Sequence, residues 1–141
     1  MKSKTIILSI HPQYVEKILS GEKHYEYRKK VPLDINQFLV YATAPIKKIV
    51  AIIEVDKVLN DTPKSIWNQT KKQSGVSHDF FVNYFKNTSN AYAIKFRRIH
   101  QLIDPLEIKV IDGIKCAPQA YVYVNVPFDD LCQKLNINTN F

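Results

Sequence analysis

The side chains best suited to chemistry are concentrated in residues 21–28, which read Gly-Glu-Lys-His-Tyr-Glu-Tyr-Arg. If residues 23–29 form a strand, alternate side chains point to opposite faces, so Glu26 and Arg28 become neighbours on one face. Arginine offers a planar fork of donors, and an adjacent carboxylate orients it. Lys23 adds a mobile cation beside the turn. This group suits an anionic or polar planar ligand, and the alternative is a solvated edge strand with a weak surface ion pair.

The elements around this run predict how it is positioned. Thr5–Ile10 has the composition of a first strand, and Pro12 follows where a helix can begin, because the first turn does not need its missing N–H. Gly21 is placed to end that helix in the left-handed conformation and to turn the chain into the Lys23 strand. The sequence therefore predicts a strand, a helix and the charged strand in succession.

The remainder of the chain predicts more strands than helices. Thr62 and Ser77 are candidate helix caps, and the second of these helices carries a bulky aromatic face over residues 80–85. A short terminal helix contains Leu131 and Leu135. Further strands are expected at Gln37–Thr43, Ile46–Leu59, Ala91–Ile99, Leu102–Ile111 and Tyr121–Val126. About six strands without regular alternation with helices favour an α+β fold, a small barrel with peripheral helices.

Length and composition limit the class of protein. A chain of 141 residues is expected to form one domain, residues 1–141, and its net charge of +7 attracts phosphate groups. Cys116 and Cys132 show no CxxC spacing, and the N-terminus does not resemble a signal peptide, so we expect a cytoplasmic protein with reduced thiols. No apolar run approaches the roughly 20 residues of a membrane span, which excludes a membrane protein of that kind.

Residues 9–28 resemble the ASCH domain, a PUA-like family whose signature is GxKxxExR after a first helix. All four signature positions are filled, by Gly21, Lys23, Glu26 and Arg28. The similarity extends from about Thr5 to Val124 and is greatest to small stand-alone ASCH proteins described as predicted transcriptional regulators. The resemblance implies a PUA-like β-barrel with a cleft beside the signature strand that binds RNA or a nucleoside.

The activity implied by the resemblance has alternatives. Some ASCH proteins hydrolyse acylated cytidine with the motif lysine, a threonine and a later glutamate, but here Glu26 occupies the threonine position and residues 68–75 contain no acid. Other ASCH proteins are described as ribonucleases. In such an enzyme Lys23 and Arg28 would stabilise phosphate charge, and His24 or Tyr25 would move protons. Lys23 and Glu26 are the candidate catalytic residues.

The first hypothesis is a binding module for single-stranded RNA or a modified nucleoside, without a cofactor. Its proposed ligand-binding residues are Lys23, Glu26, Arg28, Tyr25, Tyr41, Gln119 and His11. Tyr25 or Tyr41 would stack on a base, and Gln119 would read a base edge. The second hypothesis is a hydrolase on the same cleft, and the third is a regulator that binds DNA or a protein. The sequence leaves the oligomeric state open.

Several other polar and aromatic residues have the types needed for binding. His78 and His100 lack partners at metal-ligand spacing, so no metal site is expected. Trp67 could stack on a base, but its place on the inner side of a capped helix favours core packing. Three basic pairs are candidates to flank a phosphate path: Lys47 with Lys48, Lys71 with Lys72, and Arg97 with Arg98. From these pairs the sequence predicts that positive charge concentrates at the mouth of the cleft.

Overall fold

A computed structural model describes residues 4–111 and 113–134 of the chain. The strands are β1 (Thr5–Ile10), β2 (Tyr25–Arg28), β3 (Gln37–Ala42), β4 (Lys48–Asp61), β5 (Ala91–Leu106) and β6 (Tyr121–Val124). The α-helices are α1 (Pro12–Leu19), α2 (Pro63–Thr70), α3 (His78–Tyr84) and α4 (Phe128–Lys134). Two single 3₁₀ turns, η1 (Lys71–Gln73) and η2 (Ile108–Val110), complete the described secondary structure.

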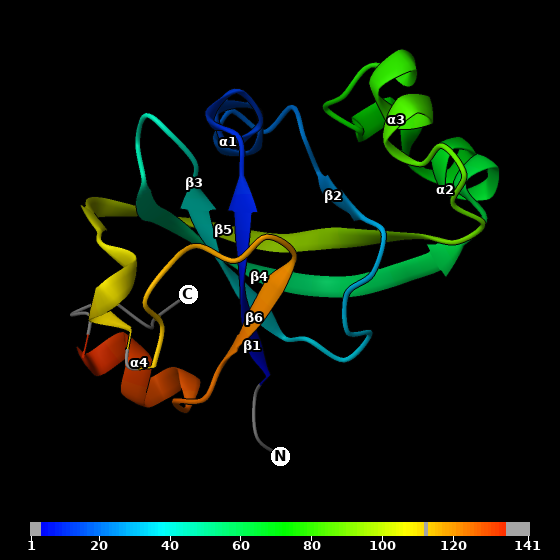
Figure 1. Cartoon of the computed structure of the whole chain (residues 1–141). Coiled ribbons are helices and arrows are strands. Elements are labelled where there is room, and N and C mark those ends of the chain that lie inside the picture. Colours follow the sequence, from blue (N-terminus) through cyan, green and yellow to red (C-terminus); the bar gives the residue numbers. More distant parts are fainter. Residues whose placement is uncertain (1–3, 112, 135–141) are drawn as a thin grey trace.

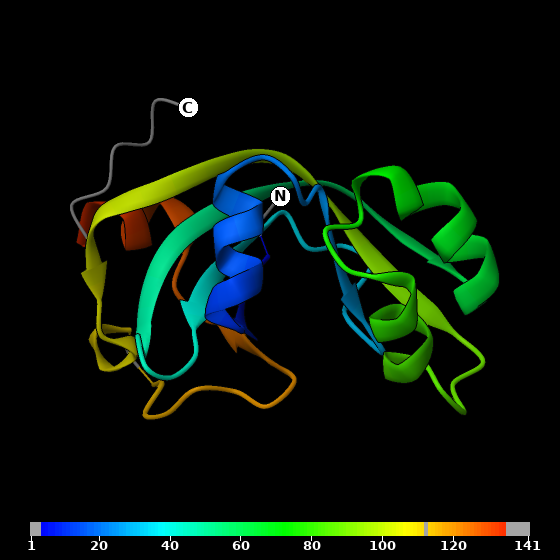
Figure 2. The same cartoon turned by 90° about the horizontal axis from the view of Figure 1, so that it is seen from above.

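All six strands belong to one sheet in the order β2-β5-β4-β3-β1-β6. The β1–β3 pair is parallel, and the other pairs are antiparallel. The sheet curls into a half-barrel, with β4 and β5 as its long central strands (Figures 1 and 2). The predicted α+β fold, a PUA-like barrel of about six strands with peripheral helices, is confirmed.

The central sheet is buried on both faces, because side chains alternate along each strand. Ile6 and Leu8 of β1 pack in one cluster with Val15 of α1. Ile7 packs in a second cluster on the other face, with Leu131 of α4. Burial on both faces explains why β1 and β4 have continuous apolar runs in the sequence.

The prediction of separate strands at Ala91–Ile99 and Leu102–Ile111 is wrong. Residues 91–106 form one strand, β5, that pairs with β4 from Ala91↔Asp61 to Leu106↔Ile49, and Ile108–Val110 is the 3₁₀ turn η2. In the sequence, the polar residues His100 and Gln101 interrupt the apolar pattern. Both nevertheless pair with β4, opposite Ile52 and Ala51, and the ladder contains register shifts at which the strands can bend. The last predicted strand ends at Val124, and Leu135 lies outside the described residues.

The helices begin where the sequence predicts. Thr62 Oγ1 accepts a hydrogen bond from the Ser65 amide at 3.3 Å, and Ser77 Oγ accepts one from the Phe80 amide at 3.1 Å. Gly21 ends the α1 segment with a φ of +87°. Helices α2 and α3 lie together at one end of the β4–β5 pair (Figure 2), and this arrangement places α3 beside β2.

Candidate functional site

A cleft of about 530 Å³ lies beside the signature strand β2. Its walls come from the end of β1, from α1, from the segment 74–84 that includes α3, and from the loop before β6. Charged side chains from β2 and aromatic rings from both helices meet there. The cleft therefore combines the polar and aromatic groups typical of a small-molecule or nucleotide site.

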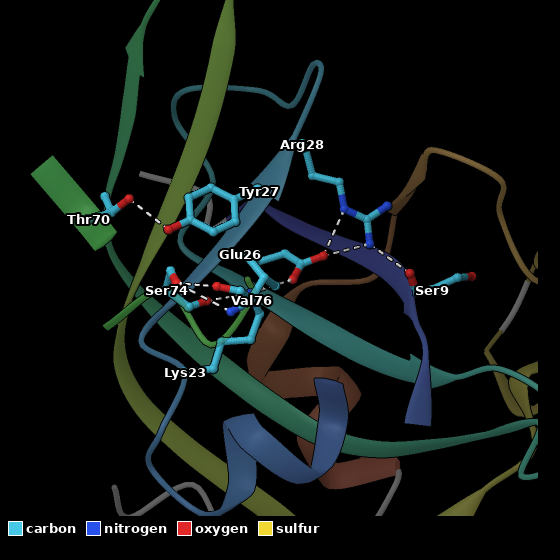
Figure 3. A network of polar contacts seen from close by, with 8 residues as sticks. All are labelled: Ser9, Lys23, Glu26, Tyr27, Arg28, Thr70, Ser74 and Val76. Carbon is cyan, nitrogen blue, oxygen red and sulfur yellow. Dashed lines mark hydrogen bonds and ion pairs between the residues drawn. The ribbon is translucent and has the colours of Figure 1, made fainter. Parts of the chain in front are cut away.

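Glu26 is a buried carboxylate that both signature cations approach (Figure 3). Its Oε2 accepts a hydrogen bond from Arg28 Nε at 3.0 Å and forms an ion pair with Arg28 Nη2 at 2.9 Å. The Lys23 ammonium lies 3.7 Å from the other carboxylate oxygen, Oε1. The predicted pairing of Glu26 and Arg28 on one strand face is confirmed, and the two cations together balance the buried negative charge.

Lys23 is not the mobile cation that the sequence predicts. Its side chain is 2% exposed, and its ammonium donates to the Ser74 carbonyl at 3.0 Å. The ammonium also lies 4.9 Å from the centre of the Tyr27 ring and 5.8 Å from that of Tyr14. Burial lowers the pKa of Lys23, against the opposing effect of Glu26. Lys23 precedes β2 rather than lying in it, and the chain here folds back against residues 73–75.

The guanidinium of Arg28 is also held by the protein. Besides Glu26, its Nη2 donates to the Ser9 carbonyl at 2.6 Å and its Nη1 to the Ala120 carbonyl at 3.4 Å. These carbonyls lie near the end of β1 and just before β6, whereas Arg28 lies on the opposite edge strand of the sheet. Arg28 therefore connects the two sides of the half-barrel, and its fork of donors is used within the chain.

Tyr27 joins the charged group to helix α2. Its hydroxyl lies 2.7 Å from Thr70 Oγ1, and its ring packs edge-on against Phe81 of α3 at 5.0 Å. Burial raises the pKa of Tyr27 to about 12, although the hydrogen bond to Thr70 acts in the opposite direction. The phenol thus stays neutral over a wide pH range. Its ring lies against the Lys23 ammonium, 4.9 Å from ring centre to nitrogen.

Five of the seven predicted ligand-binding residues line the cleft, namely Lys23, Glu26, Arg28, His11 and Gln119. His11 is exposed at the start of α1, with Nδ1 3.3 Å from Thr43 Oγ1. Gln119 is exposed in the loop before β6.

The two predicted stacking residues lie elsewhere. Tyr25 is buried in the cluster under α2 and α3, and Tyr41 is buried against the α4 face of the sheet. His24, a predicted proton carrier, does not line the cleft, and its Nε2 contacts the Gly21 carbonyl at 2.8 Å. The two stacking predictions fail because alternation along β2, which holds Tyr25, and β3, which holds Tyr41, does not show which face of the sheet each helix covers.

The aromatic rings of the cleft are Tyr14, Tyr27, Phe80 and Tyr84. Sequence reasoning assigned Phe80 and Tyr84 to a core lid, yet Phe80 is 39% exposed. A helix of seven residues with three aromatic residues in its sequence, followed directly by Phe85, carries more rings than one face can bury. This excess of rings in the sequence could have indicated that some of them line a cleft. None of the three predicted basic pairs lines the cleft, so the expected concentration of positive charge there is not found at these residues.

Within residues 4–111 and 113–134, no group of three or more His, Cys, Asp or Glu side chains could hold a metal ion. No described helix has the length and apolar character needed to cross a membrane.

The chain matches a known family over about two thirds of its length. Residues 8–100 match the ASCH domain. The chain belongs to the ASCH family. An ASCH domain-containing ribonuclease from Zymomonas mobilis is 25% identical over 114 residues, which cover 79% of this chain and 76% of that protein. The large ribosomal subunit protein uL22 of Ureaplasma parvum is 25% identical over 124 residues, 86% of this chain but only 40% of that protein.

Solved structures agree with this assignment. The crystal structure of ASCH from Z. mobilis has 25% sequence identity and a TM-score of 0.81, and the match covers 94% of both chains. A single-substitution variant of that protein gives a TM-score of 0.82 over 94% of this chain and 96% of the other. The N-terminal domain of Staphylothermus marinus McrB, at 11% identity and a TM-score of 0.53, shares the fold alone.

The lack of a side chain at Gly75 allows Lys23 to occupy its position, and a substitution tests this. It has a φ of +69°, and a Cβ added there would lie 2.4 Å from the Cβ of Lys23. We expect Gly75→Ala to lower the free energy of unfolding by about 2–4 kcal/mol, because strain and overlap combine. Gly113→Ala is the control, since Gly113 has a φ of +86° and no atom within 4 Å of such a Cβ. Urea unfolding measures both, and equal losses would contradict the close contact with Lys23.

The raised pKa of Tyr27 predicts a pH-dependent contribution to stability. A folded-state pKa of about 12 against an ordinary value of 10.0 means that the contribution is complete below pH 10 and is lost as the pH approaches 12. The difference in unfolding free energy between the parent and Tyr27→Phe should shift by about 1 kcal/mol between pH 9 and 11. Tyr123→Phe, at an exposed position on β6, controls for general alkaline effects. A parent–variant difference that stays constant over this range would refute the assignment.

Proposed function

We propose that this ASCH domain binds RNA or a nucleoside in the cleft, with Glu26 as the group that recognises the base. The observation that carries the proposal is a buried, charge-balanced carboxylate in an aromatic-lined cleft. A carboxylate accepts hydrogen bonds from the ring and exocyclic N–H groups of a base. Its burial strengthens such bonds, because water competes less for the same oxygens.

The two oxygens of Glu26 differ in what they offer a ligand. Oε2 already accepts a hydrogen bond from Arg28 Nε and forms an ion pair with Arg28 Nη2, whereas Oε1 lies 3.7 Å from the Lys23 ammonium. A carboxylate oxygen has two lone pairs, so Oε1 keeps acceptor capacity for a base amino group. Lys23 lies on the same side, where its buried ammonium adds positive charge to the wall of the cleft while it stays bonded to Ser74.

The aromatic walls supply the stacking surface that a base requires. The rings of Tyr14 and Phe80 lie 5.2 Å apart between centroids, and Phe80 and Tyr84 are nearly parallel at 7° with centroids 6.1 Å apart. Base–aromatic stacking contributes about 1–3 kcal/mol per base. At the rim of the cleft, His11 and Gln119 offer donors and acceptors to the sugar or the base edge.

RNA is favoured over other ligands by the net charge of +7 and by the name of the Z. mobilis relative, which is a ribonuclease. The relatives described above include no protein named as a transcriptional regulator. DNA binding and a regulatory role therefore remain predictions outside this proposal.

RNA hydrolysis in the same cleft is the second candidate, because of the same relative. Lys23 would stabilise charge that develops on a phosphate, and Glu26 or His11 would accept a proton. His11 takes the place of His24 and Tyr25, which do not line the cleft. The amidohydrolase alternative is less favoured, because Glu26 occupies the position of the threonine that those enzymes use.

Glu26→Gln tests the binding proposal. The substitution keeps the shape of the side chain but replaces one acceptor oxygen with a donor, so affinity for cytidine, adenosine or guanosine should fall by about 1–3 kcal/mol. Thermal shift with single nucleosides and short RNAs identifies the ligand, because binding to the folded state alone raises stability. Glu54→Gln is the control, since Glu54 pairs with His100 on β5 outside the cleft. Equal affinity of Glu26→Gln and the parent would refute the role of Glu26.

His11→Ala separates binding from hydrolysis. If the cleft hydrolyses RNA, the variant should lose cleavage of an end-labelled RNA by about 10²-fold or more while keeping most of its affinity, because a proton carrier acts mainly in the transition state. If the cleft only binds, the parent itself shows no cleavage. Cleavage at the same rate in the parent, His11→Ala and Glu26→Gln would indicate a contaminating nuclease and would contradict hydrolysis in this cleft.

A further inference from the structure

A second hollow lies on the other side of α3, in the groove between α2 and α3. It encloses about 670 Å³ and is lined by residues 63–71 of the α2 segment and 78–88 of the α3 segment. Phe80 and Tyr84 of α3 line the cleft, whereas Phe81 and Val82 line this groove. The helix therefore separates two surfaces, and the function proposed for the cleft does not account for the second.

The groove combines an aromatic platform with positive charge. The Trp67 indole packs against Phe81 and His78, with ring centroids 4.9 Å and 5.0 Å away. Trp67 is partly exposed and His78 is exposed, and both line the groove, so part of this aromatic cluster is accessible from the groove. The sequence favoured core packing for Trp67, and the structure shows both packing and access.

Three lysines surround this platform, namely Lys64, Lys71 and Lys86. All three are exposed, and none of them forms an ion pair with another described residue. No carboxylate lines the groove among the described residues. The nearby Asp61 carboxylate is engaged at the start of α2, where it accepts from the Thr62 amide and the Ser65 hydroxyl.

We infer that this groove is a second binding site for single-stranded RNA, in which a base stacks on Trp67 and the three lysines contact the adjacent phosphates. Stacking surfaces inside a positively charged groove are the common device for binding single strands without sequence preference. Lysine suits phosphate as a flexible point charge, and an uncompensated trio of lysines favours a polyanion over an apolar peptide.

The two sites are connected by packed rings. The Lys23 ammonium in the cleft lies 4.9 Å from the Tyr27 ring, which lies 5.0 Å from Phe81, which in turn lies 4.9 Å from Trp67. The two surfaces therefore lie on opposite sides of one packed layer of rings. The inference extends the proposed function to a second surface and does not require the cleft to bind.

The experiment compares fluorescein-labelled ten-nucleotide oligouridine with an abasic oligonucleotide of the same length. Trp67→Ala should weaken binding of the oligouridine by about 5- to 100-fold, and the preference for oligouridine over the abasic strand should shrink. Tyr123→Ala is the control, because Tyr123 is exposed on β6 and lines neither site. Thermal unfolding establishes that each variant is folded.

A surface variant keeps the test valid if Trp67→Ala fails to fold. The triple variant Lys64→Gln, Lys71→Gln and Lys86→Gln should lower the slope of log affinity against log salt by about 2, because each phosphate contact in a single strand contributes about 0.7. The matched control removes three exposed charges elsewhere, by Lys30→Gln, Lys57→Gln and Arg98→Gln. An equal slope in the two triple variants would overturn the inference.

The outcomes also separate this inference from the function of the cleft. Loss of binding in Glu26→Gln with no effect of the groove variants would refute the second site alone. Loss only in the groove variants would support the groove and refute the cleft. A tryptophan-containing polyglutamate peptide that competes fully with oligouridine for the parent would instead indicate an acidic protein partner and would overturn the assignment to RNA.

Discussion

The structure around the cleft depends on the cost of burying the Glu26 carboxylate. An isolated buried carboxylate is strongly disfavoured, so its position requires opposite charge and hydrogen bonds at close range. Arg28 provides a hydrogen bond and an ion pair, and Lys23 provides the second cation. Lys23 can approach only because Gly75 has no side chain, and this contact draws the segment between α2 and α3 against the signature turn. The charge balance thus fixes local backbone geometry as well as side chains.

Much of the fold and part of the site follow from the sequence. The helix starts at Pro12, Thr62 and Ser77 and the Glu26–Arg28 pair depend on local spacing, which a sequence displays directly. The burial of Lys23 does not follow from spacing, because its Ser74 partner lies 51 residues away. The continuity of β5 also escapes local reasoning, since pairing with β4 holds its polar middle in the sheet.

Helix α3 illustrates the same limit for aromatic residues. The sequence shows a cluster of rings between Phe80 and Phe85 but cannot specify the rotation of the helix about its axis. The structure divides the rings, so that Phe80 and Tyr84 face the cleft whereas Phe81 and Phe85 pack over Tyr27. Helix α3 with the adjoining Phe85 therefore contributes to both the cleft and the groove. A substitution of Phe80 or Tyr84 would alter the cleft, whereas one of Phe81 or Phe85 would alter the groove.

The two signature cations donate hydrogen bonds to main-chain carbonyls that lie outside the motif. Lys23 donates to the carbonyl of Ser74, and Arg28 donates to those of Ser9 and Ala120. A carbonyl is present whichever side chain a residue carries, so these three positions can change identity over evolution without loss of the contact. The charged arrangement of the signature therefore depends on the path of the main chain around it more than on the side chains at these three positions.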